Sequence, residues 1–168
     1  MNKNEILDLK YLRFIENHEN IIFLGPPGVG KTHLSIAIGM ETALNRISTY
    51  FISCHDLIMQ LKRSYLENRL EQRIRHFTSY AVLIIDEVGY LPLDKDASNL
   101  LFQLIAKRYE KKTTIITTNK NITHEHYQRF GTEWRVEKLL QLDADSAPFE
   151  ERSQGHRLHE AMGRRARP

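Results

Sequence analysis

The sequence predicts an α/β fold of three layers, in which helices cover both faces of a mainly parallel sheet. Segments rich in β-branched and apolar residues alternate with segments whose apolar residues recur every three or four positions. The run AVLII at residues 81–85 is apolar without interruption, which is typical of a central parallel strand covered on both faces. A glycine-rich loop separates the first strand from a helix, and strands that alternate with helices pair in parallel through right-handed crossovers.

The same patterns predict the individual elements. The long segment 56–77 has apolar residues that step by three or four with one slip, and Asp56 is a candidate N-cap. Pro92 breaks the chain before the next helix. In chain order we expect a helix over 4–17, a strand over 21–24, a helix over 32–44, a strand over 48–53, a helix over 56–77, a strand over 81–85, a helix over 97–109 and a strand over 113–118.

Length and composition indicate one soluble domain. The chain has 168 residues, of which 41% are apolar and 27% are charged. No apolar run approaches the ~20 residues of a membrane span, and the first five residues lead into no signal-peptide segment, so we expect no membrane partner. The single cysteine, Cys54, cannot form an internal disulfide, which fits a cytoplasmic location.

The most informative segment is GPPGVGKT at residues 25–32, which fits the phosphate-binding loop pattern G-x-x-x-x-G-K-[ST]. Its glycines let backbone N–H groups curl around an anion, and the following helix N-terminus adds partial positive charge. Lys31 can reach the β- and γ-phosphates, and the Thr32 hydroxyl can ligate Mg²⁺. The alternative is a Gly/Pro turn that matches by chance. The predicted nucleotide-binding residues are Gly25, Pro26, Pro27, Gly28, Val29, Gly30, Lys31, Thr32 and His33.

Polar residues also follow the third and fourth predicted strands. Ligands of such sheets bind beyond the carboxyl ends of the strands, so these residues should lie near the loop. Asp86 fits a Mg²⁺ ligand, Glu87 is placed to polarise an attacking water, and Asn119 can orient that water. The alternatives are ordinary acids at a strand end and an asparagine that tolerates a turn. We therefore predict ATP as the ligand, Lys31, Glu87 and Asn119 as catalytic residues, and Thr32 and Asp86 as Mg²⁺ ligands.

Histidines form no convincing metal site. His124 and His126 would point to opposite sides of a strand. His156 and His159 could share a helix face, but the segment around them looks unstructured. Mg²⁺ bound with the nucleotide is the expected ion.

The net charge of +3 permits a nucleic-acid partner without requiring one. Positive charge gathers on two predicted helices, and each cluster is either a DNA-contacting face or a solvated helix surface. The first cluster contains Lys62, Arg63, Arg69, Arg73 and Arg75, and the second contains Lys107, Arg108, Lys111 and Lys112.

Residues 20–131 closely resemble IstB-like proteins, the helper ATPases of insertion-sequence transposition, which are related to the DnaC helicase loaders within the AAA+ superfamily. The phosphate loop is shared by many ATPases, whereas segments 86–93 and 100–110 are much more specific. The resemblance rests on IFLGPPGVGKTHL at 22–34, LIIDEVGYLPL at 83–93, NLLFQLI at 99–105, RYE at 108–110 and TTN at 117–119.

This resemblance implies an ATP-dependent assembly factor with an AAA+ P-loop fold. In the family, ATP promotes homo-oligomerisation on DNA, here expected to be double-stranded, and hydrolysis is tied to recruiting or releasing the transposase. By similarity, Lys31 and Thr32 are Walker A ligands, Asp86 and Glu87 are the Walker B pair, and Asn119 is the sensor.

The chain departs from the family pattern at both ends. We expect an N-terminal helix over 1–19 in place of a larger helical domain, an AAA+ core over 20–131, and a divergent, poorly ordered tail over 132–168. The segment from Glu137 to Leu140 is interpreted as a shortened counterpart of a family helix, with Lys138 in place of an arginine finger, or as the product of a lost reading frame.

Two consequences follow from that interpretation. The sheet would lack the final strand that AAA+ proteins place beside the phosphate-loop strand, leaving residues 21–24 as an exposed apolar edge. Lysine cannot reproduce the planar fork of arginine on a phosphate, so the chain would keep its nucleotide site and hydrolyse ATP poorly. The candidates for an arginine that reaches a neighbouring subunit's ATP are Arg108, Arg129 and Arg135.

Four functions are compatible with these residues. A transposition helper ATPase and a replication helicase loader share the same core and differ in partner, a transposase or a replicative helicase. A truncated nucleotide-binding remnant would bind ATP without efficient turnover. A small-molecule P-loop kinase is disfavoured, because it needs an acceptor pocket rather than the water-activating Glu87.

Overall fold

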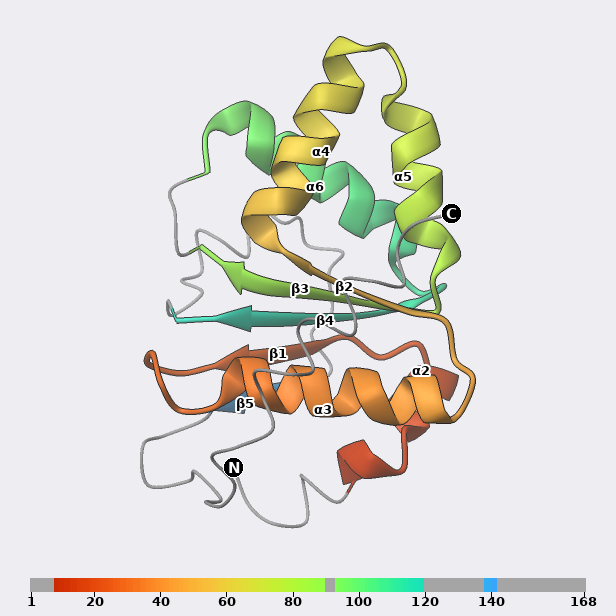
Figure 1. Ribbon diagram of the computed structural model, residues 1–168, viewed down its shortest axis with the longest axis vertical. Helices are drawn as coiled ribbons and strands as arrows, with labels where there is room; N and C mark the ends of the chain where they lie inside the picture. The colour runs from red at the N-terminus through yellow and green to blue at the C-terminus, as the bar shows by residue number, and fades with distance from the viewer. Residues whose placement is uncertain (1–7, 90–92, 120–137, 142–168) are drawn as a thin grey trace.

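The computed structural model describes residues 8–89, 93–119 and 138–141. At its centre is a five-stranded sheet in the order β2-β3-β4-β1-β5 (Figure 1). Every pair of neighbouring strands in this sheet is parallel, which confirms the predicted fold class. The strands are β1 (Ile21–Leu24), β2 (Thr49–Ser53), β3 (Val82–Val88), β4 (Thr113–Thr118) and β5 (Lys138–Gln141).

Helices on both sides of the sheet complete the three layers. One face is covered by α4 (Cys54–Leu66), α5 (Leu70–Ser79) and α6 (Lys95–Arg108), and α3 (Lys31–Leu44) lies on the other face with α2 (Arg13–Glu16) at its far end (Figure 1). None of the helices in the described part of the chain combines the length and the apolar character that crossing a bilayer requires.

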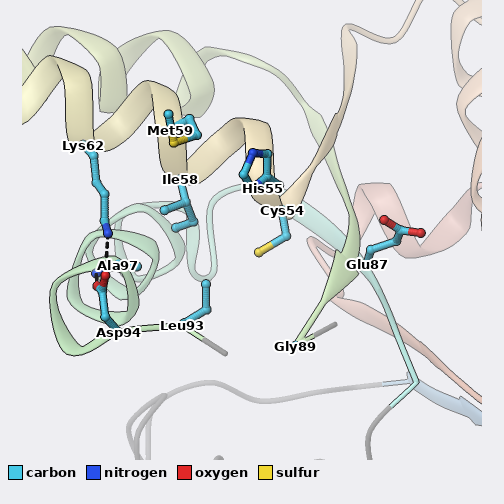
Figure 2. A pocket seen from close by; sticks show the side chains of 10 residues that line it. All are labelled: Cys54, His55, Ile58, Met59, Lys62, Glu87, Gly89, Leu93, Asp94 and Ala97. Atoms are coloured by element: carbon cyan, nitrogen blue, oxygen red, sulfur yellow. Dashed lines mark hydrogen bonds and ion pairs between the residues drawn. The ribbon is translucent and has the colours of Figure 1, made fainter. Parts of the chain in front are cut away.

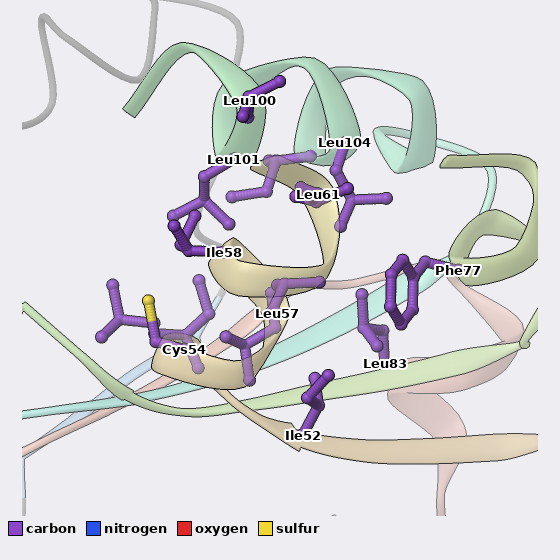
Figure 3. Packing of buried hydrophobic residues seen from close by; sticks show 14 of the residues in the cluster. Ile52, Cys54, Leu57, Ile58, Leu61, Phe77, Leu83, Leu100, Leu101 and Leu104 are labelled. Atoms are coloured by element: carbon purple, nitrogen blue, oxygen red, sulfur yellow. The ribbon is translucent and has the colours of Figure 1, made fainter. Parts of the chain in front are cut away.

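Alternate residues of the central strands enter two separate cores. In β3, Leu83 and Ile85 belong to the core beneath α4, α5 and α6, whereas Val82 and Ile84 belong to the core on the α3 side. This explains why the β3 sequence shows no polar alternation, since both of its faces are buried. Figure 3 shows the first core, in which residues of the sheet, α4, α5 and α6 interlock, among them Ile52, Leu57, Leu61, Phe77, Leu83, Leu101 and Leu104.

Most predicted elements are confirmed within one or two residues. The predicted bounds of β1 and β4 are those observed, and β3 continues past Ile85 through both acidic residues to Val88. α6 begins at Lys95, two residues earlier than predicted, because Asp94 caps it by accepting a hydrogen bond from the Ala97 N–H at 2.7 Å.

The predicted helix over 56–77 is wrong in its continuity, because two helices occupy the segment. α4 ends at Leu66 and α5 begins at Leu70, with Asn68 between them in the left-handed conformation (φ 56°). The slip in the apolar pattern, a step of five from Tyr65 to Leu70, marks this break. The N-cap is also corrected: the Ser53 hydroxyl accepts from the Asp56 N–H at 3.0 Å, so Asp56 lies in the first turn.

The predicted N-terminal helix is likewise interrupted where the structure describes it. Residues 8–10 are helical, Leu12 then adopts φ 56°, and α2 follows as a separate helix of four residues. The left-handed residue turns the chain so that Leu9, Leu12 and Phe14 are all buried against the α3 side of the sheet. Residues 1–7 lie outside the described residues.

The expectation that the sheet lacks its final strand is wrong. β5 pairs in parallel with β1, with Ile22 opposite Leu139 and Leu24 opposite Gln141. β1 therefore lies between β4 and β5 and is not an exposed edge, and Lys138–Gln141 is a strand rather than a shortened helix. A strand of four residues (KLLQ) in a polar surrounding sequence carries little local signal, and its pairing comes from the sheet.

A β-bulge interrupts β3 at its acidic residues. Ile85 pairs with Ile116 and Val88 pairs with Thr118, so Asp86 and Glu87 together lie opposite the single residue Thr117. Glu87 takes the left-handed conformation (φ 61°), in which an L-residue costs about 1–2 kcal/mol relative to glycine. The bulge leaves Asp86 and Val88 buried on either side of an exposed Glu87.

Arg108, in the last turn of α6, is a structural residue. Its side chain is 0% exposed, and its guanidinium donates to the carbonyls of Thr113 (2.6 Å), Phe77 (2.8 Å), Tyr80 (2.9 Å) and Ala81 (3.4 Å) and to Thr114 Oγ1 (3.1 Å). Burial lowers the pKa of this guanidinium to about 10. Arg108 thus ties the ends of α5 and α6 to the starts of β3 and β4, and it is unavailable as a DNA contact or a trans-acting arginine.

Replacing Arg108 should destabilise the whole domain. We expect Arg108→Met to lower the free energy of unfolding by about 3 kcal/mol or more, because the buried acceptors around it would lose a charged donor. Arg108→Lys should also destabilise, since an ammonium lacks the planar fork. Urea denaturation measures both, with the exposed Arg63→Met as the control expected within about 0.5 kcal/mol of wild type. A decrease below about 1 kcal/mol for Arg108→Met would contradict this assignment.

The bulge predicts an unusual order of stability at position 87. We expect Glu87→Gly to be about 1 kcal/mol more stable than Glu87→Ala, because glycine adopts a positive φ without the Cβ penalty. At the exposed Glu71, in the first turn of α5, the order should reverse, with alanine the more stable. Urea denaturation of the four variants tests this, and the same order at both positions would refute it.

Candidate functional site

The phosphate-binding loop connects β1 to α3 at the carboxyl end of the sheet. Gly28 and Gly30 have φ values of +84° and +92°, which glycine adopts at low cost. A Cβ built on either glycine meets no heavy atom within 4 Å. Backbone conformation, rather than space, therefore requires glycine at both positions. His33 is exposed on the first turn of α3.

Lys31 begins α3 with its side chain folded back over the loop. Its Nζ donates to the carbonyls of Gly25 (2.8 Å) and Pro26 (2.7 Å), and the residue is 9% exposed. Burial lowers the pKa of the ammonium, and the negative charges of Asp86 and Glu87 oppose that shift. The Lys31 ammonium thus lies over the loop and within the electrostatic field of both acids.

Thr32 and Asp86 connect the loop to the end of β3. Thr32 Oγ1 lies 3.1 Å from each carboxylate oxygen of Asp86. Oδ1 of the Asp86 carboxylate also accepts a hydrogen bond from the hydroxyl of Thr117 on β4. A 7% exposed carboxylate is therefore held by hydroxyls from two different elements.

Glu87 projects from the bulge into solvent, while its backbone is anchored to β4. Its N–H donates to Thr117 Oγ1 at 2.9 Å. Glu87 also borders a cavity of about 210 Å³ between the N-terminal ends of α4 and α6. Figure 2 shows Glu87 and His55 at one side of this cavity and the Lys62–Asp94 ion pair (2.6 Å) at the other. In the same cavity wall, burial raises the pKa of the Cys54 thiol to about 11, which makes it unreactive.

Asn119 directly follows β4, whose last residue, Thr118, pairs with both Leu24 and Val88. This pairing brings Asn119 to the same edge of the sheet as the loop and the acids. Its Oδ1 is buried and has no hydrogen-bond partner within the described part of the chain. Buried polar atoms in proteins are nearly always paired, so this amide is suited to bind a polar group supplied from outside the chain.

The structure thus brings the predicted site residues to one edge of the sheet, and it adds one that the sequence patterns do not reveal. Thr117 stands in the sequence only as part of a β-rich run and a family motif, because nothing in TTIITT distinguishes one threonine from the next. Its position opposite the bulge requires the pairing of β3 with β4. Arg129, Arg135, His124, His126, His156 and His159 lie outside the described residues.

Comparison with known sequences agrees with this geometry. The profile of the family described as "IstB-like ATP binding protein" matches residues 1–145, beyond the resemblance that ends at residue 131. The chain is 60% identical over 121 residues to the ATP-binding protein of insertion sequence IS232 from Bacillus thuringiensis subsp. berliner, covering 72% of this chain and 48% of that protein. It is 51% identical to the corresponding protein of IS5376 from Geobacillus stearothermophilus, with the same coverage. The chain spans about half the length of these curated relatives.

Solved structures share the fold. The DnaC helicase loader superposes with a TM-score of 0.66 at 26% identity, covering 85% of this chain and 92% of that one. The replication initiator DnaA bound to AMPPCP and single-stranded DNA superposes with a TM-score of 0.68 at 18% identity, covering 85% and 47%, and shows the fold alone. The chain has a nucleotide-binding P-loop fold with AAA+ neighbours, and it belongs to the IstB-like ATP-binding protein family.

Proposed function

We propose that this chain binds ATP with Mg²⁺ and hydrolyses it as a helper ATPase that assembles on DNA and assists a transposase. The observation that carries the proposal is the Thr32–Asp86 contact, in which a hydroxyl of the phosphate loop and a carboxylate at the end of β3 meet at 3.1 Å. The insertion-sequence relatives, at 60% and 51% identity, support the choice of transposition.

The residues present fit a magnesium ion. Mg²⁺ prefers hard oxygen ligands and binds through one or two carboxylates together with substrate phosphates, and Thr32 and Asp86 offer a hydroxyl and a carboxylate side by side. When bound, the ion would neutralise charge that develops on the phosphates. In our proposal, Lys31 and the backbone N–H groups of the loop bind the β- and γ-phosphates.

Glu87 is the proposed general base. Its carboxylate can take the proton of a water whose oxygen bonds to the γ-phosphorus, while the bond to the β-phosphate oxygen breaks and ADP leaves. Asn119 is proposed to orient that water or the γ-phosphate through its buried amide. Since Arg108 is buried in the fold, Arg129 and Arg135 remain the proposed candidates for an arginine that reaches a neighbouring subunit in an oligomer.

DNA is the proposed partner of the basic cluster on α4 and α5, which comprises Lys62, Arg63, Arg69, Arg73 and Arg75. Part of this charge is already paired, since Lys62 contacts Asp94 and both Arg63 and Arg69 contact Glu67. Arg73 and Arg75 form no ion pair with the described residues. They are therefore the best candidates for phosphate contacts.

A second candidate function is the loading of a replicative helicase. It is favoured by the DnaC helicase loader, which this chain matches at 26% identity over 92% of that protein. The two functions share the nucleotide site and differ in the protein partner. Purified transposase and purified helicase, offered separately to the ATP-bound chain, would distinguish them by which one co-elutes.

Nucleotide turnover tests the central proposal. Wild type should bind ATP and hydrolyse it in a Mg²⁺-dependent way. Lys31→Ala should weaken ATP binding, and Glu87→Gln should keep binding while turnover falls by about 10²-fold or more. Titration with ATP and steady-state phosphate release, with and without double-stranded DNA, give both quantities. ATP binding without turnover above the Glu87→Gln background would support the nucleotide-binding remnant instead.

Salt dependence of DNA binding tests the basic cluster. The double variant Arg73→Ala/Arg75→Ala should reduce the slope of log K against log[salt] by about 0.9 for each phosphate that the variant no longer neutralises. The control is Arg13→Ala/Arg46→Ala, which removes the same charge from α2 and from the turn after α3, and α3 covers the opposite face of the sheet from α4 and α5 (Figure 1). Equal slopes for the two double variants would exclude Arg73 and Arg75 as phosphate contacts.

A further inference from the structure

Thr117 lies between the two acidic residues of the site. Its side chain is 1% exposed, and the bulge in β3 places Asp86 and Glu87 together opposite it. The Glu87 N–H donates to Thr117 Oγ1 at 2.9 Å, and the Thr117 hydroxyl donates to Asp86 Oδ1.

In these two contacts the Thr117 hydroxyl acts once as an acceptor and once as a donor. A threonine hydroxyl has one proton to donate and two lone pairs to accept with, so accepting from Glu87 while donating to Asp86 fixes its orientation. The Asp86 carboxylate also accepts from Thr32 of the phosphate loop. A continuous chain of hydrogen bonds therefore runs from the loop, through Asp86 and Thr117, to the backbone of Glu87.

We propose that Thr117 is a positioning residue for ATP hydrolysis. Its hydroxyl holds the Asp86 carboxylate in place beside Thr32 and stabilises the left-handed backbone from which Glu87 projects. The assignment rests on the proposed function, and it goes beyond it by adding a residue that contacts neither the nucleotide nor the water.

The other buried threonines of β4 show how this role differs from that of a hydroxyl that only needs a hydrogen-bond partner. Thr113 Oγ1 contacts the Phe14 carbonyl at 3.4 Å, and Thr114 Oγ1 accepts from Arg108. Both of these partners are structural. A hydroxyl needed only for strand stability would not have to bridge one acid's carboxylate and the next acid's N–H.

The test compares Thr117→Val, which removes the hydroxyl but keeps the shape, with Thr117→Ser, which keeps the hydroxyl. Turnover should fall by about 10–100-fold in the valine variant, as for other residues that orient catalytic groups. Its ATP dissociation constant should stay within about threefold of wild type, and the serine variant should recover most of the activity. Thr113→Val, at the other end of β4, is the matched control and should keep its turnover.

Amide hydrogen exchange at Glu87, followed by NMR without nucleotide, gives a readout that does not depend on hydrolysis. In Thr117→Val this amide has no side-chain acceptor and should exchange about tenfold faster or more, while the neighbouring ladder amides of β3 keep their protection. If the valine variant fails to fold, Thr117→Ala compared with Thr117→Ser gives the same contrast.

The outcomes separate the two proposals. Unchanged turnover in Thr117→Val, unchanged exchange at the Glu87 amide, or a serine variant as slow as the valine variant would each overturn the assignment of Thr117. A wild-type chain without turnover would overturn hydrolysis as the proposed function. In that case, hydrogen exchange at the Glu87 amide in Thr117→Val alone tests whether Thr117 positions the bulge.

Discussion

Parallel pairing of β4 with both β1 and β3 is the constraint on which the site depends. Ile116 lies opposite Ile22 on one side and Ile85 on the other, so the carboxyl ends of three strands reach one edge together. The phosphate loop follows β1, Asn119 follows β4, and the two acids lie in β3, just before its end at Val88. Neighbouring strands are about 4.8 Å apart, which is close enough for side chains on adjacent strands to bond directly. The contacts of Asp86 with Thr32 and Thr117 are consequences of this arrangement.

Sequence patterns are sufficient for the elements whose signal is local. The apolar run predicts β3, because a strand buried on both faces requires apolar residues at successive positions. The glycine-rich loop predicts the start of α3, because phosphate-loop geometry requires glycines at fixed positions before a helix. The patterns fail where the structure or role of a residue depends on contacts with segments distant in the sequence. β5 has too few residues to be recognised alone, and Arg108 resembles one more cation in a basic run until its five acceptors are known. Thr117 belongs to the same class, since only the register of β3 against β4 sets it apart from its neighbours.

The site departs from the rules that govern the rest of the fold. A glutamate occupies a left-handed position that glycine would fill more cheaply, and a lysine ammonium is nearly buried while its hydrogen bonds go to backbone carbonyls. Asn119 keeps a buried oxygen without a partner among the described residues. Such conflicts between local preference and observed conformation concentrate at functional sites, where the surrounding structure supports them. Here the support is the paired strands, whose amino ends the Arg108 hydrogen bonds tie to α5 and α6.

The place of β1 in the sheet has a consequence for synthesis of the protein. β1 precedes both of its partners in the sheet, β4 and β5, and the two strands between β1 and β4 in the chain, β2 and β3, pair with each other. The apolar strand β1 therefore has neither of its neighbours in the sheet until residues 113–118 and then residues 138–141 have emerged from the ribosome. Contacts of such long sequence separation form slowly, and unpaired strands promote aggregation meanwhile. The nucleotide site is thus completed only after β4 and β5 have been translated, although its loop precedes both of them in the chain.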